Sequence, residues 1–180
     1  MASTAVMNSN GAVDLALLGL LAEAPRSRRE LIGTIKVVGG DGFTPTSAFI
    51  EGRIADLIES GYLEPEAHGE LLCATAPGTD HLTRLLRQEI DPGAATLRGF
   101  CTTLKLSLLN RVGAECRHEV LASLMAAGQR RADQLETARW ADRGGSMTER
   151  CLALEQQRAA VELRWMRDVL AAEGIGETLA

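Results

Sequence analysis

Apolar residues recur at helical spacing through most of the chain, and residues 43–63 show the pattern most clearly. Within that stretch four apolar residues are three or four positions apart or adjacent: Ile50, Ile54, Leu57 and Ile58. Thr44 can cap such a helix, Pro45 suits its first turn, and Gly61 stands where a helix often ends in a left-handed residue. The pattern therefore predicts a capped helix with one buried face.

The elements expected on both sides of this helix give a known order. Asp14 can cap a mostly apolar first helix, and Ser27-Arg-Arg-Glu is a capping-box pattern that opens a second one. Residues 62–74 suggest two short strands of a hairpin, and Thr75 can cap a further helix that runs to Ile90. Three helices, a hairpin and a helix form the layout of a winged helix-turn-helix.

The second half of the chain has the pattern of long helices. Its apolar stripes include Leu97, Phe100, Leu104 and Leu108, then Val120, Leu121 and Leu124, and finally Leu152, Ala159, Leu163, Met166 and Leu170. The last stripe has a spacing close to a heptad. Leu154, Val161 and Trp165 lie outside it and widen the apolar surface. The helices could pack only on each other as a hairpin, but this extra surface favours a homodimer in which a twin completes the packing.

These patterns divide the chain into three parts. Residues 1–12 are small and polar and are expected to be a disordered leader. Residues 13–91 form the expected winged-helix domain, and residues 92–180 the expected C-terminal helical dimerisation domain, with the break at Asp91-Pro92-Gly93. The predicted fold class is mainly α, with β structure confined to the small hairpin wing.

Composition narrows the class of protein. Aromatic residues make up only 3% of the chain, and no apolar run approaches the roughly 20 residues that span a bilayer. The N-terminus lacks the features of a signal peptide, so a cytoplasmic protein without a membrane partner is expected. The four cysteines are widely spaced, which favours reduced thiols and no metal or other cofactor. No phosphate-binding loop or nucleophile elbow is present, and we expect no enzyme.

Several short runs, in order, carry a resemblance over about 160 residues: Asp14 to Leu21 (DLALLGLL), Arg29 to Ile32 (RELI), the series Ile50, Ile54, Leu57, Gly61, Leu63, Thr75, Gly78 and Leu82, then Phe100 with Leu104 to Leu109, and Arg158 to Leu170. In these features the chain resembles the PadR family of bacterial transcriptional regulators. The resemblance implies a homodimeric, DNA-binding transcriptional regulator, with repression as the expected sense. It also implies regulation by a small molecule or another signal at the dimer interface.

Candidate residues for double-stranded DNA lie at two places in the predicted winged helix. They are Arg26, Arg28 and Arg29 at the start of the second helix, and Thr46, Ser47 and Arg53 on the polar face of the third. Cations and backbone amides at a helix start suit phosphates, and arginine to guanine is the commonest base contact. Arg53 is therefore the expected base contact. Taken singly, any one of the arginines is more simply a solubilising surface charge.

The charge balance supports an alternative. Residues 1–90 contain 7 Lys and Arg against 12 Asp and Glu, and the hairpin has Glu64, Glu66, His68 and Glu70 but no basic residue. DNA affinity depends largely on neutralised phosphates. A winged-helix module that binds another protein is therefore the second hypothesis. The third hypothesis is a helical small-molecule-binding protein whose winged helix is vestigial.

Two tryptophans are the candidate effector residues. Trp140 and Trp165 fall on the long helices, where aromatic side chains could line a pocket for a flat ligand. Some relatives in the resembling family stack a ligand on a tryptophan pair. Core packing is the simpler interpretation, particularly for Trp165.

Overall fold

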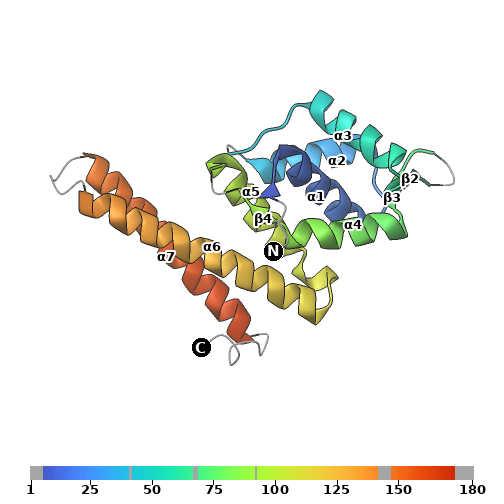
Figure 1. Ribbon diagram of the computed structural model, residues 1–180. Coiled ribbons are helices and arrows are strands. Elements are labelled where there is room, and N and C mark those ends of the chain that lie inside the picture. Colours follow the sequence, from blue (N-terminus) through green and yellow to red (C-terminus); the bar gives the residue numbers. More distant parts are fainter. Residues whose placement is uncertain (1–5, 41, 67–68, 92, 142–146, 173–180) are drawn as a thin grey trace. The chain divides into compact units, whose positions relative to one another are not determined.

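The structure is a computed structural model that describes residues 6–40, 42–66, 69–91, 93–141 and 147–172 (Figure 1). They fall into two compact units, which divide between Arg117 and His118. The elements are β1 Val6–Met7, α1 Ser9–Leu21, α2 Arg28–Gly39, α3 Ser47–Glu59, β2 Leu63–Pro65, β3 Leu72–Ala74, α4 Ala76–Arg87, β4 Glu89–Ile90, α5 Ala95–Ser107, η1 Leu109–Arg111, α6 Ala114–Ala141 and α7 Met147–Ala172. The mainly α class predicted from the sequence is confirmed.

Helix α1 is the centre of the first unit. It contacts α2, α3, α4 and α5, and its residues from Ala12 to Gly19 are all buried because they are apolar or small on most sides. Asp14 does not cap this helix. The cap is Asn8, whose side chain accepts a hydrogen bond from the Gly11 amide at 3.0 Å, so the helix starts earlier than predicted.

Part of the expected leader is ordered structure. Met7 is fully buried, and β1 pairs in parallel with β4 through the partners Val6–Glu89 and Met7–Ile90. Burial of an apolar side chain supplies the free energy that a polar leader would lack. The predicted leader therefore does not extend to residue 12, while residues 1–5 lie outside the described ranges.

The next elements form the winged helix. Ser27 and Glu30 make the predicted capping box at the start of α2. Strands β2 and β3 are antiparallel, with Leu63 opposite Ala74, and Arg26 adds a bridge to Leu72 as the third strand position of the wing. Gly61 has a φ of 71°, so the predicted left-handed end of the third helix is confirmed. The first unit is thus a winged helix-turn-helix with α4 after the wing.

Helix α5 packs within the first unit. Its apolar stripe is buried at Leu97, Phe100, Cys101, Leu104 and Leu108. Gly19 of α1 permits this packing, because a Cβ there would stand 2.5 Å from Leu108 Cδ1. The chain therefore divides after Arg117 and not at residue 91, since α5 buries its apolar stripe with the helices that precede it.

A buried lysine joins α5 to the end of α4. Lys105 is 1% exposed, and its Nζ donates to the Leu86 carbonyl at 2.8 Å and to the Gln88 carbonyl. These carbonyls lie at the C-terminal end of α4, where a cation is favourable. Burial lowers the pKa of Lys105 to about 8, against a smaller raising effect from Cys101 and Glu89.

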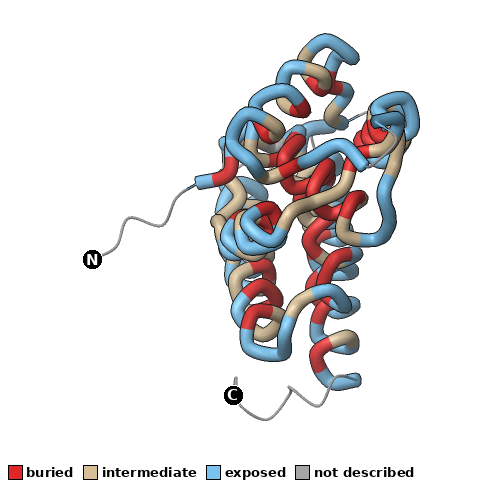
Figure 2. Tube along the Cα trace, turned by 90° about the vertical axis from the view of Figure 1, so that its right-hand side faces the viewer, coloured by how far each residue is buried: buried red, intermediate tan, exposed pale blue. Residues whose placement is uncertain are grey.

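The second unit contains α7 and most of α6, which run side by side as an antiparallel hairpin (Figures 1 and 2). Arg131 of α6 bonds Glu155 of α7 at 2.7 Å, and a Cβ at Gly128 would stand 2.9 Å from Leu163. The buried residues of α7 are Ala159, Leu163, Met166 and Leu170, four of the five residues of the predicted stripe. No described helix is both long and apolar enough to cross a membrane.

Candidate nucleic-acid interface

Helix α3 is held on the unit by one apolar face. Ile50, Ile54 and Leu57 are buried, as the sequence predicted. The cap is Thr46 and not Thr44: its hydroxyl accepts from the Phe49 amide at 3.2 Å, so α3 starts at Ser47 and Pro45 precedes the helix. The exposed side carries small residues, namely Ser47, Ala48, Gly52 and Ala55. A surface of this kind lets another macromolecule approach the helix backbone.

Arg53 forms ion pairs with two carboxylates of its own unit. Its Nε and Nη2 donate to the two oxygens of Asp14 at 2.8 and 2.7 Å, and Nη1 donates to Asp56 at 2.6 Å. The side chains of Arg53 and Asp14 are only 18% and 7% exposed. The hydrogen bonds with Asp14 raise the pKa of Arg53. A base contact by Arg53 would require this guanidinium to leave a buried carboxylate, so the geometry assigns Arg53 to holding α3 on α1.

Two polar contacts join the exposed edges of α2 and α3. Arg28 Nη1 donates to Glu51 at 3.0 Å, and Lys36 Nζ donates to the Ser47 hydroxyl at 2.7 Å. Both side chains of the Arg28–Glu51 pair are more than two-fifths exposed. Exposed pairs of this kind contribute little stability, about 0–1 kcal/mol, so Arg28 can exchange its partner at low cost.

The other two arginines of the α2 start differ in position. Arg26 is part of the wing through its backbone bridge to Leu72, and its guanidinium donates to Glu23 at 3.0 Å. Arg29 is exposed and has no ion-pair or hydrogen-bond partner among the residues that the structure describes. Arg29 is therefore the predicted DNA residue whose cation is most available to a phosphate.

Lys36 is a residue that the sequence reasoning missed. It follows Arg29 by seven positions, so the two cations lie on the same side of α2. This spacing was visible in the sequence. The contact with Ser47 was not, because it depends on how α2 packs on α3.

The wing is acidic where it is described. Glu64 and Glu66 on one side and Glu70 on the other are exposed, and His68 lies outside the described residues. Burial, together with the charges of Glu64 and Glu66, raises the pKa of Cys73 on β3. The wing therefore presents negative charge, which does not suit contact with phosphates.

The two tryptophans do not form a pair within the chain. Gly128 of α6 packs against Leu163 and Met166 of α7, which bracket Trp165 in the sequence, and Trp140 is 12 residues farther along α6. At the helical rise of 1.5 Å per residue, that is a separation of roughly 18 Å along the axis. Trp140 and Trp165 are 60% and 50% exposed, so neither is a core residue of the described chain.

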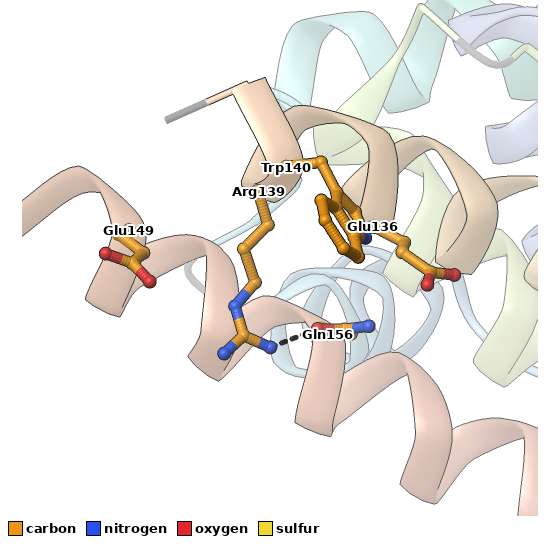
Figure 3. Close-up of a pocket in the computed structure, with 5 residues that line it drawn as sticks. All are labelled: Glu136, Arg139, Trp140, Glu149 and Gln156. Carbon is orange, nitrogen blue, oxygen red and sulfur yellow. Dashed lines mark hydrogen bonds between the residues drawn. The ribbon is translucent and has the colours of Figure 1, made fainter. Parts of the chain in front are cut away.

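Trp140 lines an open pocket of about 330 Å³ between α6 and α7 (Figure 3). The other lining residues are Glu136, Arg139, Glu149 and Gln156, and Arg139 Nη1 donates to Gln156 at 3.0 Å. The pocket thus combines an aromatic face with two carboxylates and one guanidinium. Among the described residues no three His, Cys, Asp or Glu side chains gather as a metal site.

Comparisons with known proteins add a structural likeness. No protein-family model matches the chain, and no curated protein matches its sequence. The chain is similar to the crystal structure of Bacillus subtilis PadR, with 12% identity and a TM-score of 0.41, over 93% of this chain and 98% of that one. It is similar over the same shares to the crystal structure of B. subtilis PadR in complex with p-coumaric acid, with 14% identity and a TM-score of 0.43. The element order of the chain and the pairing of β2 with β3 by themselves define a winged helix.

Proposed function

We propose that the chain is a homodimeric DNA-binding repressor of transcription, with α3 as the helix that enters the major groove. The observation that supports this most directly is the N-terminal half of α3. It exposes Ser47, Ala48 and Gly52, and the cations Arg29 and Lys36 stand on the adjacent α2. Small side chains flanked by cations suit a helix that lies close to phosphates.

Phosphate and base contacts are assigned to different residues. Arg29 and Lys36 contact phosphates, with Arg26 and Arg28 as further cations at the start of α2. Thr46 and Ser47 offer hydroxyl groups at the α3 N-terminus, where backbone amides also favour an anion. When Arg28 turns from Glu51 to a phosphate, the freed Glu51 can accept a hydrogen bond from a cytosine amino group.

The test is a salt series of binding to a duplex from the protein's own upstream region and to a random duplex. We expect the wild type to bind the upstream duplex more tightly, with an affinity that falls as salt rises. Arg29→Ala/Lys36→Ala should reduce the steepness of log affinity against log salt by up to about 3.6, because the homodimer loses two phosphate contacts from each protomer and each lost contact contributes about 0.9. Arg130→Ala, an exposed arginine of α6, is the matched control and should leave the slope unchanged. A wild type without salt-dependent binding above random DNA would contradict the proposal.

The acidic wing favours one second candidate, a winged-helix module for a basic protein surface. Glu64→Lys/Glu66→Lys separates the two readings. If the wing lies beside DNA, this variant binds the upstream duplex more tightly than the wild type does. If the module binds protein, neither form binds DNA above the random level.

The proposed effector site is the Trp140 pocket. Its indole face and the carboxylates of Glu136 and Glu149 fit a flat molecule with a positive group, since aromatic faces attract cations. Such a ligand would act by favouring one arrangement of the dimer. A planar organic cation such as a dye should quench tryptophan fluorescence, Glu136→Gln/Glu149→Gln should weaken that binding, and Trp165→Phe should leave it intact. Trp165 lies outside this pocket.

A further inference from the structure

Helix α7 has a second apolar stripe on the side away from α6. Its large exposed apolar residues are Met147, Leu154, Val161 and Trp165, with exposed fractions of 71%, 48%, 68% and 50%. Met147, Leu154 and Val161 follow one another at intervals of seven, and Trp165 follows after four. Intervals of seven and four place these side chains on one face of a helix.

This outer stripe is distinct from the buried one. Ala159, Leu163, Met166 and Leu170 are at most 5% exposed, and a position two residues before or after one of them points to the other side of the helix. Val161 and Trp165, each two residues from Leu163, therefore lie nearly opposite it. A helix of 26 residues with a large apolar stripe on its open side has a second surface to bury.

Between Leu154 and Ala172 two charged residues interrupt the outer stripe, and they select how a twin helix can pack. Arg158 and Asp168 are exposed and stand at stripe positions, four residues after Leu154 and seven after Val161 respectively. In a parallel pair of identical helices each residue meets itself, so Arg158 would face an arginine and Asp168 an aspartate. In an antiparallel pair centred near Leu163, Arg158 of one helix faces Asp168 of the other.

We propose that α7 pairs antiparallel with α7 of a second copy of this chain through the 154–172 stretch. The central layers match Val161 with the partner's Trp165 and Trp165 with the partner's Val161. Arg158 faces the partner's Asp168 on both sides of them, and Leu154 faces the partner's Ala172. This inference uses the homodimer of the proposed function for the presence of two copies, and specifies the surface and its direction.

The like-charge contacts of this arrangement fall on its rim. Glu162 and Arg164 flank the stripe on opposite sides, and each lies near its own copy in the antiparallel pair. Both are exposed, so solvent screens each repulsion. The Arg158–Asp168 contacts lie between apolar layers and have less access to solvent, where ion pairing is stronger.

The experiment is sedimentation equilibrium of the full chain with a reciprocal charge exchange. Arg158→Asp and Asp168→Arg, taken singly, each turn two attractive contacts into two repulsive ones, and we expect the dimer dissociation constant to rise by about 10-fold or more. Arg158→Asp/Asp168→Arg should restore it to within about 3-fold of the wild type. The double variant still lacks the Arg158–Glu155 contact within the chain, so recovery can come only from the partner. Arg167→Asp, an exposed α7 arginine off the stripe, is the control and should dimerise normally.

Other outcomes identify which step fails. Single variants that dimerise like the wild type would overturn the antiparallel pairing and leave the proposed homodimer, on another surface, in place. Single variants that weaken the dimer without recovery in the double variant would also overturn the pairing, provided circular dichroism shows native helix content. A wild type that is a monomer at every concentration would contradict the homodimer itself. A dimer that does not bind DNA would contradict only the proposed DNA binding by the winged helix.

Discussion

Arg53 of α3 and Asp14 of α1 form a bidentate ion pair, with Nε and Nη2 donating to the two carboxylate oxygens at 2.8 and 2.7 Å. The pair joins the helix that we propose enters DNA to the most buried helix of its unit. Asp14 lies among apolar residues of α1, so its charge has few other partners there. To the apolar face of α3 this pair therefore adds a polar contact between residues 39 positions apart in the sequence.

Asp14→Asn tests this connection. The asparagine keeps the shape of the side chain and one acceptor oxygen but removes the charge that faces Arg53, which leaves Asp56 as the carboxylate paired with a partly buried guanidinium. We expect a loss of roughly 3 kcal/mol in the free energy of unfolding, measured by urea denaturation. Arg28→Ala removes an exposed ion pair instead and should cost under about 1 kcal/mol. Equal losses for the two variants would show that the buried Arg53–Asp14 pair stabilises the protein no more than the exposed Arg28–Glu51 pair does.

Gly52→Ala separates stability from DNA binding. Gly52 lies inside α3, and a Cβ there meets nothing within 4 Å. Alanine should stabilise the protein by about 0.5–1 kcal/mol in thermal or urea unfolding. It should weaken binding to the upstream duplex, because a methyl group is added to the surface proposed to face DNA. Gly99→Ala, at an equally open position of α5, should stabilise without changing DNA affinity.

Gly78→Ala should have the opposite effect on stability. A Cβ at this position would stand 2.1 Å from the Tyr62 carbonyl oxygen, and a backbone atom cannot turn aside as a side chain can. The substitution must separate the start of α4 from the wing, at a cost of about 2–3 kcal/mol in urea unfolding. Gly33→Ala in α2 meets nothing within 4 Å and provides the control. An unchanged Gly78→Ala protein would show that α4 does not pack this closely on the wing.

Because Lys105 is buried, we expect the protein to become more stable as the pH rises into the alkaline range. Its pKa is lowered from 10.5 to about 8 by burial, so between these values the unfolded chain holds a proton that the folded chain has released. The free energy of unfolding should therefore increase with pH over this range, by up to about 3 kcal/mol. Lys105→Met removes the titrating group, and the difference between wild type and variant in urea unfolding should change with pH only above about 7.

Titration of Cys101 limits the pH range in which the effect of Lys105 can be measured. Burial raises its pKa from 9.0 to about 11, so the unfolded chain loses this proton first and stability falls as pH rises above 9. The two effects have opposite signs. Unfolding compared between pH 7 and 9 isolates Lys105, and a flat difference between wild type and Lys105→Met there would contradict the prediction.

The sequence predicted the elements of the winged helix better than it predicted the partners of its arginines. Arg53 was the expected base contact because it is the arginine on the polar side of α3, and only the packing of α3 on α1 places Asp14 beside it. Arg28 and Arg29 are adjacent in sequence, yet one pairs with Glu51 and the other is exposed without a partner among the described residues. Adjacent residues of a helix point about 100° apart, so their neighbours come from different elements.

The features that can be predicted from local sequence depend on neighbours within a few residues. The capping box at Ser27, the left-handed Gly61 and the buried stripe of α3 follow from local hydrogen bonds and helical spacing. Long-range packing was needed to show that Asp14 is an ion-pair partner and not a cap, and that α5 belongs with the first unit, because both depend on residues far apart in the sequence. For α7 the heptad-like spacing already separated the two sides: four of the five predicted stripe residues are buried, and Leu154, Val161 and Trp165 outside the stripe are exposed.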